Sequence, residues 1–140
     1  MLWIHPVIQV LATLLALAAL RLGFKRFTAL HLGGRALFPW RTHVRLGLAA
    51  VSLWLMGFVG GSMLARWLFG QGFATSHGRL ALVMLPLILI GAGTGLFMHR
   101  NRARRRALPL VHAAANLAAL ACAAALTVSG STLVQANLLG

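Results

Sequence analysis

The residues of this 140-residue chain best suited to chemistry are its six histidines, because it contains no Asp or Glu and only one cysteine, Cys122. Without carboxylates the chain lacks common general bases, the side-chain ligands of calcium and magnesium, and the groups of a buried proton relay. A lone cysteine also excludes an intrachain disulfide framework and a thiolate zinc site. The histidines are His5, His31, His43, His77, His99 and His112.

Four of these histidines each open one of four long apolar stretches of the chain. Consecutive membrane helices run in opposite directions, so the first and third openings fall at one membrane face and the second and fourth at the other. His5 and His77 are therefore expected near the outer face. His43 and His112 are expected near the inner face. Because ionisable residues at membrane depth are candidates for function, the sequence predicts two functional pairs of imidazoles, one in each leaflet.

A short repeat surrounds two of these histidines. Segments 42–48 and 76–82 both read Ser/Thr-His-x-Arg-Leu-small-Leu. The Ser or Thr is a natural N-cap, which places each histidine in the first turn of its helix. Arg45 and Arg79 follow two residues later and extend toward the headgroups, where they can meet an anionic group of a cofactor, a redox partner or a lipid.

The other two histidines are each followed four residues later by an amide side chain. Gln9 follows His5, and Asn116 follows His112. Residues four apart share a helix face, so these amides can bond to a ligand beside the imidazole.

Facing imidazoles with arginine nearby fit a b-type haem. The iron takes axial histidine nitrogens, the macrocycle suits an apolar bundle, and the propionates pair with cations. Zinc instead prefers three or four protein ligands, and each leaflet offers only a pair. We therefore expect two haem b groups per chain, with His5 and His77 holding the outer iron. His43 and His112 would hold the inner iron.

The elements that must position these residues are membrane-spanning helices. Hydrophobic residues make up 60% of the chain and charged residues 9%, all of them basic, which is unlike a soluble domain. Each apolar stretch has the roughly 20 residues that a helix needs to cross a bilayer. The prediction is an all-α, four-helix transmembrane bundle in a single domain, residues 1–140. Its helices are expected at about 3–23, 42–65, 77–99 and 108–132.

Basic residues predict how the chain is oriented. Eleven of the 13 fall in or beside the loops after the first and third helices, leaving Arg66 and Arg79 on the other side. The bias of Lys and Arg toward cytoplasmic loops puts both termini on the outer, periplasmic side of a bacterial inner membrane. No basic residue precedes the first helix, so that helix is interpreted as a retained anchor rather than a signal peptide. Membrane topology and anionic headgroups already explain the positive charge, so no nucleic-acid partner is expected. Contact with anionic membrane lipids is expected instead.

Several other residues receive simpler interpretations. His31 is expected to be a solvated residue of the first loop, and His99, beside Arg100, is an alternative inner ligand. Two small-residue motifs, Gly57–Gly61 and Gly91–Gly95, predict close helix packing. Cys122 is interpreted as an inert apolar residue.

With these residues in view, the chain resembles the cytochrome b561 family of transmembrane di-haem proteins. The resemblance covers about residues 3–130 and is carried by the His5-Pro6 pair, by segments 41–43 and 76–80, and by His112. It implies the same four ligands in the same pairs, and electron transfer across a membrane between ascorbate-like donors and acceptors such as monodehydroascorbate or ferric chelates. Many eukaryotic members have six helices, whereas this chain keeps only a four-helix core and shows no ascorbate-site motif.

The expected function is single-electron transfer between partners at the two membrane faces, either as a transmembrane oxidoreductase or as a simple electron carrier. The partners would be redox proteins, or a small donor or acceptor such as a quinone. The chain could act alone, as a homo-oligomer or inside a larger redox complex. One alternative is a haem-free structural or assembly subunit of a membrane complex. A small transporter or channel is the other, although a chain without carboxylates offers little for cation or proton coupling.

Overall fold

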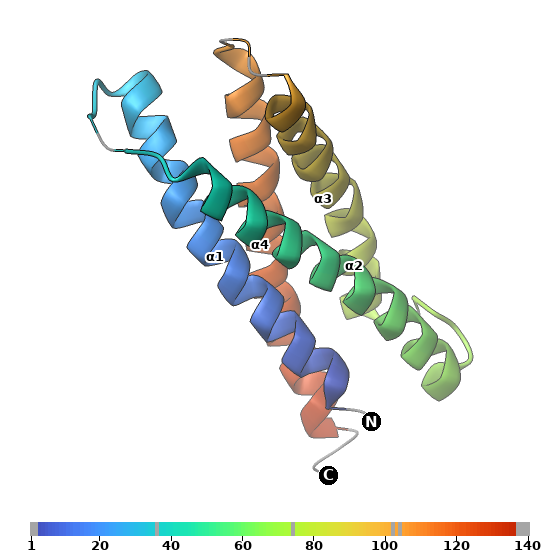
Figure 1. Ribbon diagram of the computed structural model, residues 1–140. Coiled ribbons are helices and arrows are strands. Elements are labelled where there is room, and N and C mark those ends of the chain that lie inside the picture. Colours follow the sequence, from blue (N-terminus) through green and yellow to red (C-terminus); the bar gives the residue numbers. More distant parts are fainter. Residues whose placement is uncertain (1–2, 36, 74, 102, 104, 137–140) are drawn as a thin grey trace.

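The computed structural model describes residues 3–35, 37–73, 75–101, 103 and 105–136, and in this part of the chain the regular structure is helical. Four long helices follow one another: α1 (Ile4–His31), α2 (Trp40–Phe69), α3 (Ser76–Arg100) and α4 (Ala107–Val134). All four are long and apolar enough to cross a membrane. They form the antiparallel bundle shown in Figure 1, which confirms the predicted fold class.

Two helical hairpins build the bundle. Helix α1 packs mainly against α2, and α3 packs mainly against α4, while the contacts between the two hairpins are much less extensive. The α2–α3 loop, the beginning of α1 and the end of α4 lie at one end, which we call the terminal end (Figure 1). The loops after α1 and α3 lie at the other, which we call the basic end.

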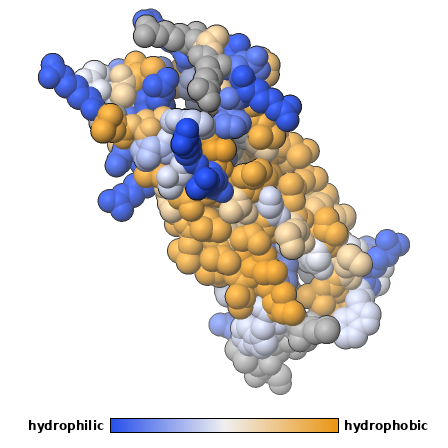
Figure 2. All heavy atoms as spheres, viewed as in Figure 1, coloured by the Kyte–Doolittle hydropathy of each residue, from blue (hydrophilic) through white to orange (hydrophobic). Residues whose placement is uncertain are grey.

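The core lies at mid-height and joins the hairpins. Its buried members are Ala12, Ala16, Ala50, Trp54, Met84, Ile88, Ala119 and Ala123. Alanines let helix backbones approach closely, which is how helices associate in lipid. Trp54 is only 3% exposed, and its indole N–H donates to the Thr13 hydroxyl at 3.4 Å. The outer surface shows a broad apolar band, with hydrophilic side chains gathered mainly at the basic end (Figure 2), as expected of a chain surrounded by lipid.

The helices are longer than the sequence predicts. Helix α1 continues through the basic segment to His31, so that histidine is the last residue of a helix and not a loop residue. Its ring packs against Phe27 one turn earlier, with the ring centroids 5.0 Å apart. Helix α2 begins at Trp40, with Pro39 (φ −77°) at its N-cap position and no side-chain cap, so Thr42 lies inside the helix and does not cap it as predicted. The prediction ended each helix where its apolar run ends, and these helices continue past that point.

Candidate functional site

The structure brings the first and third predicted histidines together at the terminal end. His5 begins α1, His77 begins α3, and their ring centroids lie 6.3 Å apart with the ring planes inclined by 78°. Since α1 and α3 belong to different hairpins, this pair faces across the boundary between hairpins. Both side chains are partly buried.

The second and fourth histidines meet in the same way at the basic end. His43 in the first turn of α2 and His112 near the start of α4 have ring centroids 6.2 Å apart and planes inclined by 69°. This pair also joins the two hairpins. The four histidines thus form two separate pairs, one near each end of the bundle, and their role as iron ligands stays a prediction.

Backbone carbonyls orient both rings of the basic-end pair. His43 Nδ1 lies 2.9 Å from the carbonyl oxygen of Ala19, and His112 Nδ1 lies 2.9 Å from that of Gly91. A carbonyl can only accept, so both Nδ1 atoms carry a proton and Nε2 keeps its lone pair. This is the tautomer that binds a metal through Nε2. Asn116 supports the arrangement by donating from its amide to the His112 carbonyl at 2.7 Å.

The terminal-end pair has weaker hydrogen bonding. His77 Nδ1 lies 3.1 Å from the Ser129 hydroxyl, which itself donates to the Leu126 carbonyl at 3.3 Å. The Gly57 carbonyl faces the His5 ring. Nevertheless His5 Nδ1 and Gln9 Nε2 are buried atoms without a hydrogen-bond partner in the described part of the chain. Buried polar atoms without partners are rare and call for an explanation.

Each of the four rings also lies against a glycine of the other helix in its hairpin. The pairs are His5 with Gly61, His43 with Gly23, His77 with Gly130, and His112 with Gly95. A Cβ added at Gly61 would lie 2.6 Å from the His5 ring, and one at Gly130 would lie 3.2 Å from the His77 ring. The other two distances fall between these values. A side chain at Gly61 would therefore displace the His5 ring, and one at the other three positions would crowd its imidazole.

Sequence reasoning missed this role of the glycines, although the sequence contains the signal for it. In every helix a glycine follows the histidine by 18 residues. Eighteen residues make five helical turns, so the two share one helix face about 27 Å apart. In an antiparallel hairpin the glycine of each helix then lies opposite the histidine of its partner. Gly61 and Gly95, interpreted above as simple packing residues, thus meet imidazole rings, and Gly23 and Gly130 join them.

The two pairs have the same composition. One histidine of each is followed by an amide, Gln9 after His5 or Asn116 after His112. Both amides pack against a glycine of the neighbouring helix, Gly57 for Gln9 and Gly91 for Asn116. The second histidine of each pair is followed by an arginine two residues later. An approximate two-fold relation, exchanging α1 with α4 and α2 with α3, therefore relates the two ends of the bundle.

The remaining candidates lie away from the imidazole pairs. Arg45 and Arg79 are both exposed. His99 packs against Trp40, with ring centroids 5.5 Å apart, and does not join the basic-end pair. Arg45 lines a hollow between α2 and α3 together with Trp40, Arg41, Val44 and His99.

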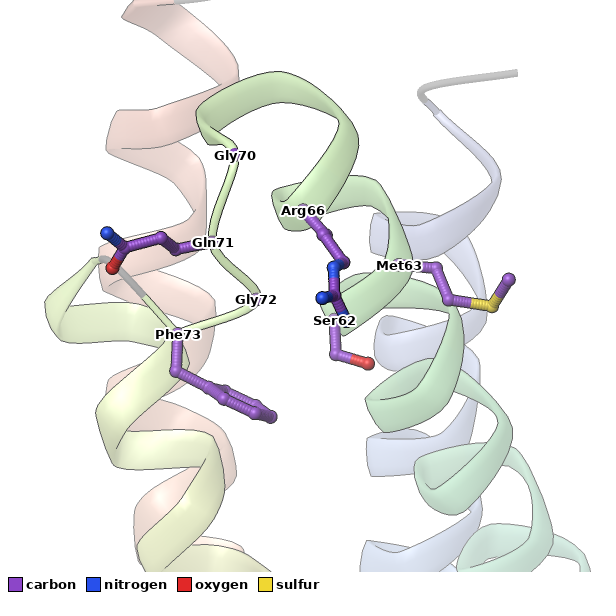
Figure 3. A pocket seen from close by; sticks show the side chains of 7 residues that line it. All are labelled: Ser62, Met63, Arg66, Gly70, Gln71, Gly72 and Phe73. Carbon is purple, nitrogen blue, oxygen red and sulfur yellow. The ribbon is translucent and has the colours of Figure 1, made fainter.

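A hollow of about 360 Å³ lies at the terminal end, lined by Ser62, Met63, Arg66, Gly70, Gln71, Gly72 and Phe73. Ser62 directly follows Gly61, the residue that contacts His5. Figure 3 shows the Arg66 side chain extending along α2 toward Ser62, while Gln71 points the other way. Phe73 stacks on Phe58, with ring centroids 5.7 Å apart. The hollow therefore combines one cation with an aromatic wall.

Within the described residues, no three His, Cys, Asp or Glu side chains converge on a common point. The imidazoles come as pairs, which suits a cofactor that needs two axial ligands better than a four-coordinate zinc ion. Compared with known proteins, the chain matches no family model, no curated protein and no solved structure.

Proposed function

We propose that this chain is a transmembrane electron-transfer protein that binds two b-type haems, one near each membrane face. The observation that carries the proposal is the spacing of the imidazole pairs, 6.3 Å and 6.2 Å between ring centroids. Imidazole nitrogens bind metals at about 2.0 Å, so two rings whose centroids lie about 6 Å apart would have room to hold one metal between them. Both pairs have that spacing.

The surroundings of the pairs fit a haem as well. Each pair spans the boundary between the hairpins, where helix contacts are sparse. The glycines opposite the rings hold each imidazole against bare backbone. At the basic end the carbonyls of Ala19 and Gly91 fix the protons on Nδ1 and leave Nε2 for iron. The unpartnered Gln9 amide can donate to a ligand beside His5.

A bound haem would supply a reversible one-electron couple of its iron at each site. The chain's own residues orient that couple and exclude water. Trp54, Met84 and Ile88 fill the space between the two levels and are 3–4% exposed. The levels are about 27 Å apart along the helices, close to the thickness of a hydrocarbon core. This spacing is consistent with one pair near each face of the proposed membrane.

The arginines beside the pairs would bind anionic groups at the two ends of this electron path. Arg45 and Arg79 follow His43 and His77 by two residues and are exposed, so both can reach a haem propionate or a redox partner. Arg66, in the terminal-end hollow, offers one cation to an anionic donor or acceptor such as an ascorbate-like molecule or a ferric chelate. A neutral quinone would instead use the Phe73 wall of this hollow.

The proposed location is a bacterial inner membrane, with the basic end in the cytoplasm and both termini in the periplasm. The concentration of Lys and Arg at one end supports this orientation. The chain would act alone or as the haem subunit of a larger redox complex.

The experiment that tests the proposal is a reduced-minus-oxidised spectrum of the purified protein with a pyridine haemochrome assay. We expect a low-spin b-type spectrum and two haems per chain. A folded, colourless protein expressed with sufficient haem would contradict the proposal and favour a haem-free structural or assembly subunit.

A further inference from the structure

The hollow at the basic end is distinct from both imidazole pairs. It lies between the first turns of α2 and the end of α3, has a volume of about 250 Å³, and is lined by Trp40, Arg41, Val44, Arg45 and His99. In a membrane, this is the level at which α2 would enter the bilayer and α3 would leave it. At this depth a lipid headgroup is the natural neighbour.

The hollow is built from cations and aromatic rings. Arg41 and Arg45 are one helical turn apart and therefore share a face of α2. The Arg41 guanidinium carbon lies 5.4 Å from the centroid of the Trp40 ring, and His99 packs against the same indole. Both arginines are exposed. The side chains that line this hollow thus include two cations and the N–H groups of an indole and an imidazole.

No side chain of this protein can neutralise that charge, because the sequence contains no Asp or Glu. The anion that neutralises Arg41 and Arg45 therefore cannot be a side chain of this protein. Arginine binds phosphate through two parallel N–H···O bonds, and basic pockets between membrane helices on the cytoplasmic side are suited to phosphate headgroups. The apolar Val44 and Trp40 side chains beside the cations suit the glycerol and upper acyl region of a lipid.

We infer that this hollow is a binding site for the phosphate headgroup of an anionic phospholipid. The inference does not depend on the proposed haems. It assigns Arg45 to a lipid phosphate, whereas the haem proposal also allows that arginine to pair with a propionate. A lipid held here would bridge α2 and α3, which belong to different hairpins and otherwise make few contacts.

The test compares two double variants of the full chain in detergent, titrated with phosphatidylglycerol and monitored by native mass spectrometry. The first, Arg41→Gln/Arg45→Gln, removes the cations of the hollow. The matched control, Arg21→Gln/Lys25→Gln, removes two exposed basic residues that are also one turn apart, on α1 near the same end. A direct arginine–phosphate pair binds more strongly than the diffuse attraction between a lipid and scattered cations. We therefore expect the first variant to bind phosphatidylglycerol about tenfold more weakly than the control.

Further arms identify the source of the phosphate. Phosphatidylcholine should bind weakly to the wild type, and inorganic phosphate at millimolar concentration should not displace phosphatidylglycerol. Equal losses in the two double variants would overturn the inference, because the attraction would then be diffuse. Tight binding of inorganic phosphate without a preference for the anionic lipid would also overturn it. Circular dichroism on both variants confirms that any loss occurs in a folded protein.

Discussion

The two ends of this bundle are built from the same parts but are completed differently. Each has two facing imidazoles, two opposing glycines and one amide, yet only at the basic end do both Nδ1 atoms meet a backbone carbonyl at 2.9 Å. At the terminal end His77 Nδ1 lies 3.1 Å from the Ser129 hydroxyl, with the Leu126 carbonyl also nearby. The Gly57 carbonyl faces the His5 ring, but His5 Nδ1 forms no hydrogen bond within the described residues. The glycines that hold the rings in place are therefore shared by the two ends. The hydrogen-bond partners of Nδ1, which tune the imidazole as a ligand, differ between them.

This difference has a consequence for the proposed haems. A carbonyl that accepts from Nδ1–H makes the imidazole a stronger ligand and favours ferric iron. Neighbouring cations act in the opposite direction and favour the reduced, more negative state. The cations of the basic end are mostly exposed, so salt and water screen them, whereas the hydrogen bonds are partly buried. We therefore expect the basic-end haem to have the lower potential.

The largest effect should come from removing one imidazole of each pair. His43→Ala should abolish only the basic-end haem, and His77→Ala only the terminal-end haem. Each variant should bind one haem per chain by the pyridine haemochrome assay. His99→Ala, which removes a histidine outside both pairs, is the control and should retain two. A His43→Ala variant with two haems would show that the pairing is wrong.

The next effect should come from the glycine opposite His5. In Gly61→Ala the new methyl group would lie 2.6 Å from the imidazole, an overlap that costs about 1–3 kcal/mol when a packed site must adjust. We expect terminal-end haem to be lost or held much more weakly. Gly60→Ala is the matched control, because a Cβ there meets no atom within 4 Å. If the two variants retained haem equally, Gly61 would not position the His5 ring as proposed.

A smaller effect should separate the hydrogen-bond partners. Ser129→Ala removes the hydroxyl beside His77 and should weaken retention of the terminal-end haem about tenfold, a loss typical of groups that orient a metal ligand. Thr94→Ala removes a hydroxyl 3.2 Å from His112 but leaves the Gly91 carbonyl in place. It should change retention little. If Thr94→Ala weakened haem retention more than Ser129→Ala, the Thr94 hydroxyl and not the Gly91 carbonyl would be the main partner of His112.

The smallest effect should be that of ionic strength. Raising salt screens the exposed cations of the basic end, because the Debye length falls to about 3 Å at 1 M. In a redox titration the potential of the basic-end haem should fall, and that of the terminal-end haem should change less. Equal shifts of both would mean that charge placement does not distinguish the two sites.

Much of this arrangement could be predicted from sequence. Apolar length predicted four helices, and the alternation of helix direction predicted which histidines meet. His31 and the long end of α1 were missed because hydropathy stops reporting once a helix leaves the lipid.

The orientation of the rings could not be predicted in the same way. The acceptors of His43 and His112 are backbone carbonyls, which every residue type carries, so no letter of the sequence marks them. The glycines were visible but were assigned to helix packing, since the 18-residue spacing gains its meaning only once the hairpin partners are known.

The central claim is that each imidazole pair ligates one iron, and electron paramagnetic resonance of the oxidised protein tests it most directly. Rings inclined by 78° and 69° predict strongly anisotropic low-spin ferric signals that integrate to two spins per chain. A high-spin spectrum, or a single low-spin centre in protein saturated with haem, would contradict the claim.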